Sequence, residues 1–188
     1  GSLLKALGVL HPHAALAGAE LAATAVTLAR RTLPGAEIEQ LDVARGALPR
    51  TFDLVVCADV VEHIDNDEAA LAHMAQMTAP GGHLVVATLQ GRMRNFEKDV
   101  GHLRNYAEGE LQGKMSRTGL KVDRVIEWGF PFYSPFYRDF LDLVDSRGTT
   151  GKFGPTRKLI CNLIYGVFLM NSARRGDYIF VRAQKPHA

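Results

Sequence analysis

The sequence contains little cysteine, no long hydrophobic run and no cluster of basic residues. Its two cysteines, Cys57 and Cys161, lack a metal-binding spacing, and Cys57 lies within an apolar run that suits a buried reduced thiol. We therefore expect a reducing, cytoplasmic setting. No stretch of about twenty apolar residues is present to span a bilayer, and we expect no signal peptide. The small net charge of +2 argues against a nucleic-acid partner.

Predicted strands and helices alternate along the chain, which favours an α/β fold with a mainly parallel sheet. We expect a single domain over residues 1–188, with a helical, lid-like insertion at about 129–176 between the last two strands. The expected strands are a short one within 11–20, on the apolar run 14–19 that ends in Glu20, then 36–41, 52–59, 84–88, 122–128 and 177–183. The expected helices are 2–7, with an interruption near Gly8, then 21–33, 65–79, 108–118, 134–146 and 155–171.

Three of the predicted strands end in an acidic residue, namely Glu20, Asp42 and Asp59. The carboxyl ends of parallel strands meet at one edge of a sheet, where α/β proteins bind their ligands. Each acid also has a structural interpretation, because aspartate and glutamate are common in turns and at helix starts. The pattern nevertheless indicates that the ligand site lies at this edge.

Several segments occur in a characteristic order, namely AGAELAATAVTLAR, IEQLDVARG, FDLVVCADVVEHI, APGGHLVVAT, GHLRNYAEGELQGKMSRTGLKV and GDYIFVRAQKP. In order and spacing they resemble class I S-adenosylmethionine-dependent methyltransferases of the bacterial small-molecule and cell-envelope type. The resemblance implies a Rossmann-like sheet whose last strand is antiparallel. It also implies S-adenosylmethionine as cofactor and methyl transfer to a small-molecule or lipid-linked acceptor by direct displacement.

The resemblance also implies which residues contact the cofactor. Glu20 would accept hydrogen bonds from both ribose hydroxyls, because a carboxylate offers two acceptor oxygens. Asp42 would accept from the adenine amino group, and the methionine part would lie against the end of the 52–59 strand. The implied contacts are Gly1, Glu20, Leu21, Asp42, Val43, Ala58 and Asp59.

In the family, a first strand and a glycine-rich loop precede the first helix. Only Gly1 is available here to match that loop, as its last glycine. We therefore expect a chain that is truncated within the cofactor loop and lacks the first strand. The sequence leaves open whether such a chain binds the cofactor or folds alone.

Two histidines are candidates for acid–base catalysis, because histidine titrates near neutral pH. His63 follows the acidic strand end, and His102 lies in a later loop with the sequence GHLRNY. Some methyltransferases with a Glu-x-x-Glu-His string hold a divalent metal, and Asp59 to His63 partly matches it. We favour a role for Glu62 and His63 in shaping the turn, and we assign no metal.

The 129–176 insertion is rich in aromatic residues and contains an apolar helical face at 155–171. It is interpreted as a lid over the acceptor pocket. The alternatives are an interfacial helix that meets a lipid-linked substrate at an anionic membrane, and a dimer contact. The oligomeric state stays open. Two other functions also remain open for the chain, a nicotinamide-dependent Rossmann oxidoreductase and a non-catalytic binding or scaffold module.

Overall fold

The computed structural model describes residues 1–143 and 154–187. The part of the expected helix 134–146 beyond residue 143 therefore lies outside the described residues. The elements are α1 (Ser2–Leu10), β1 (Ala17–Glu20), α2 (Ala23–Thr32), β2 (Glu37–Gln40), β3 (Phe52–Ala58), η1 (Val61–His63), α3 (Asp67–Met77), β4 (Thr78–Leu89), α4 (Asn95–Asp99), α5 (Glu110–Arg117), β5 (Lys121–Trp128), η2 (Phe132–Tyr137), α6 (Arg138–Leu143), α7 (Pro155–Phe168) and β6 (Tyr178–Gln184).

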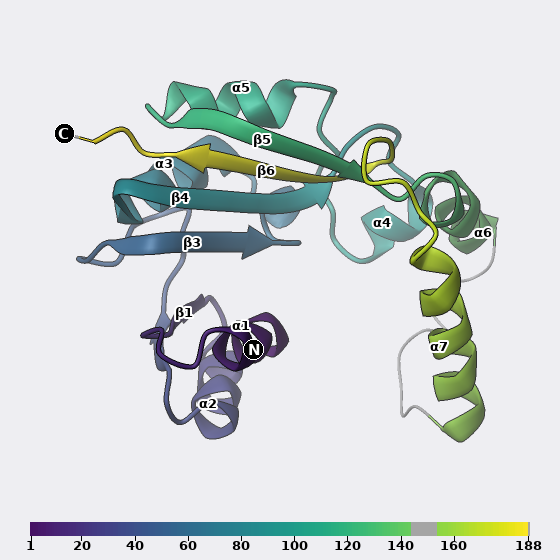
Figure 1. The fold of residues 1–188 in the computed structure, drawn as a ribbon, viewed down its shortest axis with the longest axis horizontal. Coiled ribbons are helices and arrows are strands. Elements are labelled where there is room, and N and C mark those ends of the chain that lie inside the picture. Colours follow the sequence, from purple (N-terminus) through teal and green to yellow (C-terminus); the bar gives the residue numbers. More distant parts are fainter. Residues whose placement is uncertain (144–153, 188) are drawn as a thin grey trace.

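The strands form two sheets (Figure 1). β1 and β2 pair in parallel, and with α1 and α2 they form a small unit beside β3. The larger sheet has the order β3-β4-β6-β5, in which β3 and β4 are parallel and β6 is antiparallel to both of its neighbours. The α/β class and the antiparallel last strand are therefore confirmed, and the larger sheet is mixed.

The two faces of the larger sheet differ in burial. Along β6, Ile179, Val181 and Ala183 are fully buried, whereas the residues between them are half-buried. Because side chains alternate across a strand, one face therefore packs against the core and the other stays accessible. α3 and α5 cover the packed face, where Leu71 and Leu111 are fully buried.

Helix boundaries follow local chemistry and correct two expectations. The Asn66 side chain caps α3 by accepting a hydrogen bond from the Ala69 amide at 3.1 Å. α3 then ends at Met77 rather than at residue 79, and β4 begins before the Pro-Gly-Gly segment. α1 continues through Gly8 to Leu10, so the expected interruption is wrong. Among the described helices, none has the length and hydrophobicity needed to cross a bilayer.

Asp67, at the start of α3, ties three elements together. It is buried and accepts hydrogen bonds from Lys114 Nζ at 2.7 Å and Tyr106 Oη at 2.8 Å, and it pairs with Arg104 Nη1 at 2.9 Å. Burial alone would raise the pKa of Asp67, but the bonds from Lys114 and Tyr106 hold it below its usual value. This cluster anchors the loop that carries His102 to α3 and α5.

We predict that Asp67→Asn lowers the free energy of unfolding by about 1–3 kcal/mol near neutral pH. The folded-state pKa lies below the unfolded value of about 3.9, so the carboxylate stabilises the fold above about pH 4 and loses this effect as the pH falls through the folded pKa. Urea unfolding of wild type and variant at several pH values measures the difference, with the exposed Asp65→Asn as control. A difference that persists undiminished at about pH 2 would contradict this assignment.

Candidate functional site

The first two predicted acids lie at one edge of the small sheet. Glu20 ends β1 and is opposite Gln40, the last residue of β2, so Asp42 follows at the same edge. A hydrogen bond of 3.0 Å from the Leu41 amide to the Glu20 carbonyl continues the pairing. Next to Asp42, the Val43 carbonyl oxygen lies 2.7 Å from Nδ1 of His73 on α3. This contact holds the strand ends of the small sheet against α3, which packs on the larger sheet.

The two carboxylates differ in what they already contact. The Glu20 carboxylate is half-buried and has no hydrogen-bond or ion-pair partner among the described residues, so both oxygens are available. In Asp42, Oδ1 accepts from the Ala44 amide at 3.0 Å, and Oδ2 lies 3.2 Å from Arg45 Nε. Asp42 thus forms the local turn that its sequence context permits, and it keeps only part of its acceptor capacity.

The third acid, Asp59, directly follows Ala58 at the end of β3. Its amide extends the ladder by donating to the Ala87 carbonyl at 3.0 Å, and its backbone is left-handed, with φ +52°. Aspartate tolerates this conformation better than most residues. Asp59 Oδ1 accepts a 2.8 Å hydrogen bond from Tyr178 Oη. Burial raises the pKa of the Tyr178 hydroxyl most, and the negative charge of Asp59 raises it further. The hydroxyl therefore keeps its proton and stays a hydrogen-bond donor.

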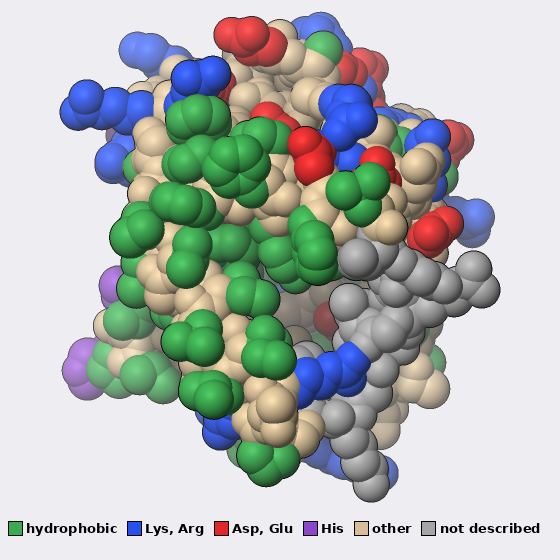
Figure 2. Space-filling view, turned by 90° about the vertical axis from the view of Figure 1, so that its right-hand side faces the viewer, with side chains coloured by type: hydrophobic (Ala, Val, Ile, Leu, Met, Phe, Trp, Pro, Cys, Tyr) green, Lys and Arg blue, Asp and Glu red, His purple; other side chains and the backbone are tan. Residues whose placement is uncertain are grey.

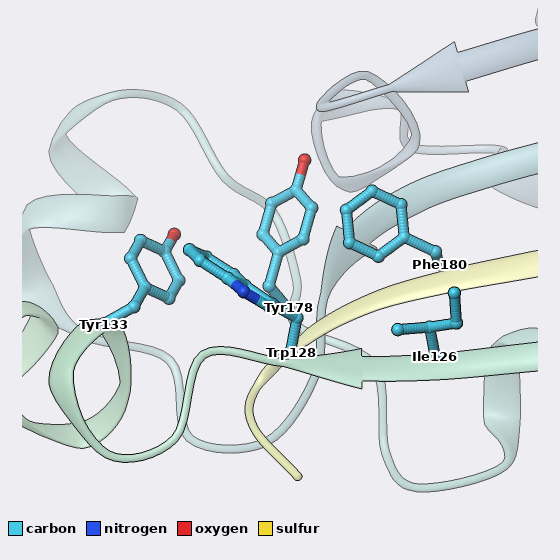
Figure 3. A pocket seen from close by; sticks show the side chains of 5 residues that line it. All are labelled: Ile126, Trp128, Tyr133, Tyr178 and Phe180. Atoms are coloured by element: carbon cyan, nitrogen blue, oxygen red, sulfur yellow. The ribbon is translucent and has the colours of Figure 1, made fainter. Parts of the chain in front are cut away.

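An aromatic cavity of about 370 Å³ lies on the accessible face of the sheet (Figure 3). Its floor consists of two neighbouring cross-strand pairs, Ile126 with Phe180 and Trp128 with Tyr178. Positions two apart on a strand share a face, so the register of β5 and β6 brings these side chains together. Tyr133, from η2, closes one end, with its ring centroid 5.1 Å from that of Trp128.

α7 contacts the aromatic wall of this cavity through Phe168. The Phe168 ring lies 5.5 Å from Tyr133, 5.2 Å from Tyr137 and 6.1 Å from Trp128, measured between centroids. Edge-to-face contacts of this kind are favourable. Burial raises the pKa of Tyr133 to about 12, so this wall stays uncharged at neutral pH. The insertion and the sheet therefore share one aromatic cluster.

Buried charges hold the cavity wall in place. Arg138 is 1% exposed and Glu97 0%, and Arg138 Nε donates to Glu97 Oε1 at 2.8 Å. Arg138 Nη1 also donates to Asp177 Oδ2 at 2.6 Å, and Ser134 Oγ bonds the same carboxylate. Asp177 immediately precedes Tyr178. The network thus fixes η2 and the start of β6 relative to each other.

The structure brings the two predicted catalytic histidines together. The His63 and His102 rings lie 4.6 Å apart between centroids, at an angle of 83°. Neither lines the aromatic cavity. Of the remaining predicted contacts, Gly1 is exposed at the N-cap of α1 and Leu21 is 65% exposed. Arg104 and Tyr106, near His102 in the sequence, instead hold Asp67.

Sequence reasoning missed the cavity floor. Alternate residues of any strand share one face. However, only the register between β5 and β6 shows that Trp128 meets Tyr178, and that register depends on the folded sheet. The buried partnership between Glu97 and Arg138 had no local sequence signal.

A family model described as a methyltransferase domain matches residues 1–84. This segment, which is less than half of the chain, is therefore similar to the methyltransferase domain family. The class I resemblance drawn from the sequence is confirmed, and all seven predicted cofactor contacts fall within the matched segment. His102 and the aromatic cavity lie beyond it.

Curated relatives match only part of the chain. A ubiquinone biosynthesis O-methyltransferase of Azoarcus sp. (strain BH72) is 33% identical over 103 residues, which cover 52% of this chain and 43% of that protein. One from Rhodopseudomonas palustris (strain BisB18) is 42% identical over 60 residues, covering 31% and 21%. The matches thus span less than half the length of these relatives.

Solved structures support the fold. A putative methyltransferase from Bacillus halodurans C-125 superimposes with a TM-score of 0.62 at 16% identity, covering 97% of this chain and 88% of that one. The [4+2]-cyclase SpnF gives 0.63 at 17% identity, covering 100% and 72%. A [4+2]-cyclase thus shares the fold, so the fold does not by itself determine the reaction.

We predict that Arg138→Met destabilises the protein by about 3–5 kcal/mol, because it leaves the buried Glu97 carboxylate without its main partner. The matched control is Arg117→Met, which breaks an exposed pair with Glu68 and should cost less than about 1 kcal/mol. Urea unfolding measures both. Equal effects of the two substitutions would show that the buried network does not support the cavity wall.

Proposed function

We propose that the protein is an S-adenosylmethionine-dependent methyltransferase that acts on a small-molecule or lipid-linked acceptor with an apolar body. The observation that carries the proposal is the hydrogen bond between Tyr178 and Asp59. It joins the aromatic cavity to the strand end where the family relationship implies the methionine part of the cofactor. An acceptor in the cavity would therefore lie next to the methyl group.

The residues at the strand ends suit this cofactor. S-adenosylmethionine supplies an electrophilic methyl group on a positively charged sulfur. Glu20 has two free carboxylate oxygens for two ribose hydroxyls, and Asp42 retains acceptor capacity for the adenine amino group beside Val43. Ala58 would contact the methionine part through its backbone. Gly1 and Leu21 stay predicted contacts on the family relationship alone.

The cavity would contribute mainly by positioning and by excluding water. Bound S-adenosylmethionine would supply the methyl group by direct displacement, with a neutral thioether as the leaving group, and the cavity residues would hold the acceptor's lone pair in line with it. The faces of Trp128 and Tyr178 suit a cationic group nearby. If the acceptor atom is a hydroxyl oxygen, its proton must leave, and His63 or His102 would receive it.

We propose that η2, α6 and α7 form the lid of one methyltransferase domain, because Phe168 covers the aromatic cluster. The cytoplasmic setting stays a prediction. This setting accords with the two free thiols, Cys57 and Cys161. Burial raises the pKa of the Cys57 thiol to about 12, so that thiol stays protonated.

The outer surface of α7 supports the lipid-linked alternative. Figure 2 shows hydrophobic side chains gathered along this helix. α7 contains no buried residue, and its exposed apolar side chains include Leu159, Ile160 and Leu163. Lys158, in the first turn of α7, and Arg174, six residues after its last residue, are exposed. An apolar face with basic flanks is suited to an anionic membrane surface, where a lipid-linked acceptor would be found.

We predict that Glu20→Ala, in the complete protein, weakens S-adenosylmethionine binding about 10- to 100-fold, which corresponds to the loss of roughly 1–3 kcal/mol of charge-assisted hydrogen bonding. Isothermal calorimetry measures the affinity. Asp53→Ala is the matched control, because Asp53 is an exposed acid near the opposite end of β3 from Asp59.

Unchanged affinity in Glu20→Ala would remove this residue from the site. NADH binding in the absence of S-adenosylmethionine binding would favour the oxidoreductase alternative, and binding of neither would favour a scaffold module. Transfer of a labelled methyl group to lipid extracts or to aromatic small molecules then distinguishes the two acceptor classes.

For the membrane contact, we predict that Leu163→Glu reduces binding to vesicles containing anionic phospholipid at least about fivefold, because it places a charge in the apolar face. Leu28→Glu on α2 is the control, since both leucines are 63% exposed. Vesicle co-sedimentation measures binding. If both variants bind as wild type does, α7 is not a membrane contact.

A further inference from the structure

Next to the tip of β3, three side chains capable of binding a metal come together. Glu62 and His63 belong to η1, and His102 lies in the loop after α4. Each offers one ligand atom, and these atoms all lie within 4.8 Å of one another. Ligands held about 2.0–2.2 Å from a shared ion lie up to about 4 Å apart, so a movement of about 1 Å or less would complete the site.

Two of these side chains carry buried atoms that lack a partner. Glu62 is 0% exposed, and its Oε2 accepts from Thr88 Oγ1 at 2.8 Å, whereas Oε1 has no hydrogen-bond partner among the described residues. His102 Nδ1 is likewise buried and unpartnered within those residues. Leaving a buried carboxylate half-satisfied is costly, which calls for a cation or a donor at this point.

His63 is already oriented as a metal ligand would be. Its Nδ1 lies 2.9 Å from the Gly101 carbonyl oxygen, so Nδ1 carries the proton and Nε2 keeps its lone pair. Histidine ligands of metals typically donate their other ring N–H to such a carbonyl. Gly101 has φ +94°, a backbone conformation that favours glycine, and so brings its carbonyl to His63.

The backbone holds the two segments together. The Leu103 amide donates to the Glu62 carbonyl at 2.9 Å, and the His102 amide donates to the carbonyl of the buried Glu97 at 3.0 Å. The three side chains are therefore held near one another by main-chain bonds on both sides of His102. A site of this kind is largely pre-formed.

We propose that Glu62, His63 and His102 bind a divalent first-row transition metal ion such as Zn²⁺. Two imidazole nitrogens and one carboxylate suit such an ion, whereas Mg²⁺ and Ca²⁺ prefer oxygen ligands. The open coordination positions would receive an oxygen of the acceptor, a role that rests on the proposed methyl transfer. With the ion bound, the coordinated histidine nitrogens could not also accept a proton, so the ion would promote loss of the acceptor's proton in place of a histidine base. Asp59 is not among the ligands, since its carboxylate is held by Tyr178.

One alternative accounts for the same unpartnered atoms. A small rotation would let His102 donate a hydrogen bond to Glu62, which would satisfy both side chains without any ion. The two arrangements differ in a measurable way, because only the metal site gives zinc binding that depends on all three residues.

The test is calorimetric titration of the metal-free complete protein with zinc chloride. We expect about one ion per chain, and a loss of affinity of more than about tenfold in both His102→Ala and the isosteric Glu62→Gln. His13→Ala is the control, because His13 is exposed and is not a member of the cluster, and it should bind as wild type does. The absorption spectrum of the Co²⁺-loaded protein should change in His102→Ala and stay unchanged in His13→Ala.

Absence of zinc binding, or equal affinity in His102→Ala and His13→Ala, would overturn the metal site. S-adenosylmethionine binding is measured on the same samples. Intact cofactor binding without zinc binding rejects the metal site alone, whereas zinc binding that requires His102 in a protein unable to bind S-adenosylmethionine rejects the proposed function alone.

Discussion

The position of β6 between β4 and β5 is the constraint on which both faces of the larger sheet depend. Its alternation places Ile179, Val181 and Ala183 under α3 and α5, where they form the centre of the core. The same alternation turns Tyr178 and Phe180 to the other face. The strand that completes the core therefore also forms part of the cavity floor. A register slip of one residue would exchange the two faces and remove both at once.

Buried charged residues then fix the loops and helices beside this sheet. Asp67 fixes the loop before α5 from one side, and Glu97, through Arg138, fixes α4 and α6 from the other. Because Glu97 also receives the His102 amide through its carbonyl, the histidine loop and the cavity wall share a support. A charge pair with almost no solvent contact is costly to break, so these connections restrict motion in the region where an acceptor would bind.

The parts of the fold that could be predicted from the sequence are those whose signals are local. Apolar runs with acidic ends marked β1, β2 and β3, and the acidic residues before α3 marked its start. The exposed Leu21 and the turn made by Asp42 show where strand-end patterns say little about side-chain contacts. The cavity floor and the pairing of Glu97 with Arg138 depend on register and on contacts between distant segments, which no local pattern records.

The same distinction separates the two halves of the proposed reaction. The expected cofactor contacts lie at strand ends within residues 1–84, the segment that matches the family. The aromatic cavity and His102 lie beyond that segment and are assembled by β5, β6 and the insertion. Asp59 stands at the junction, because its left-handed turn lets its carboxylate meet Tyr178 while Glu62 and His63 continue toward His102. On the proposed function, substitutions around the cavity would therefore alter acceptor preference and leave the strand-end carboxylates untouched.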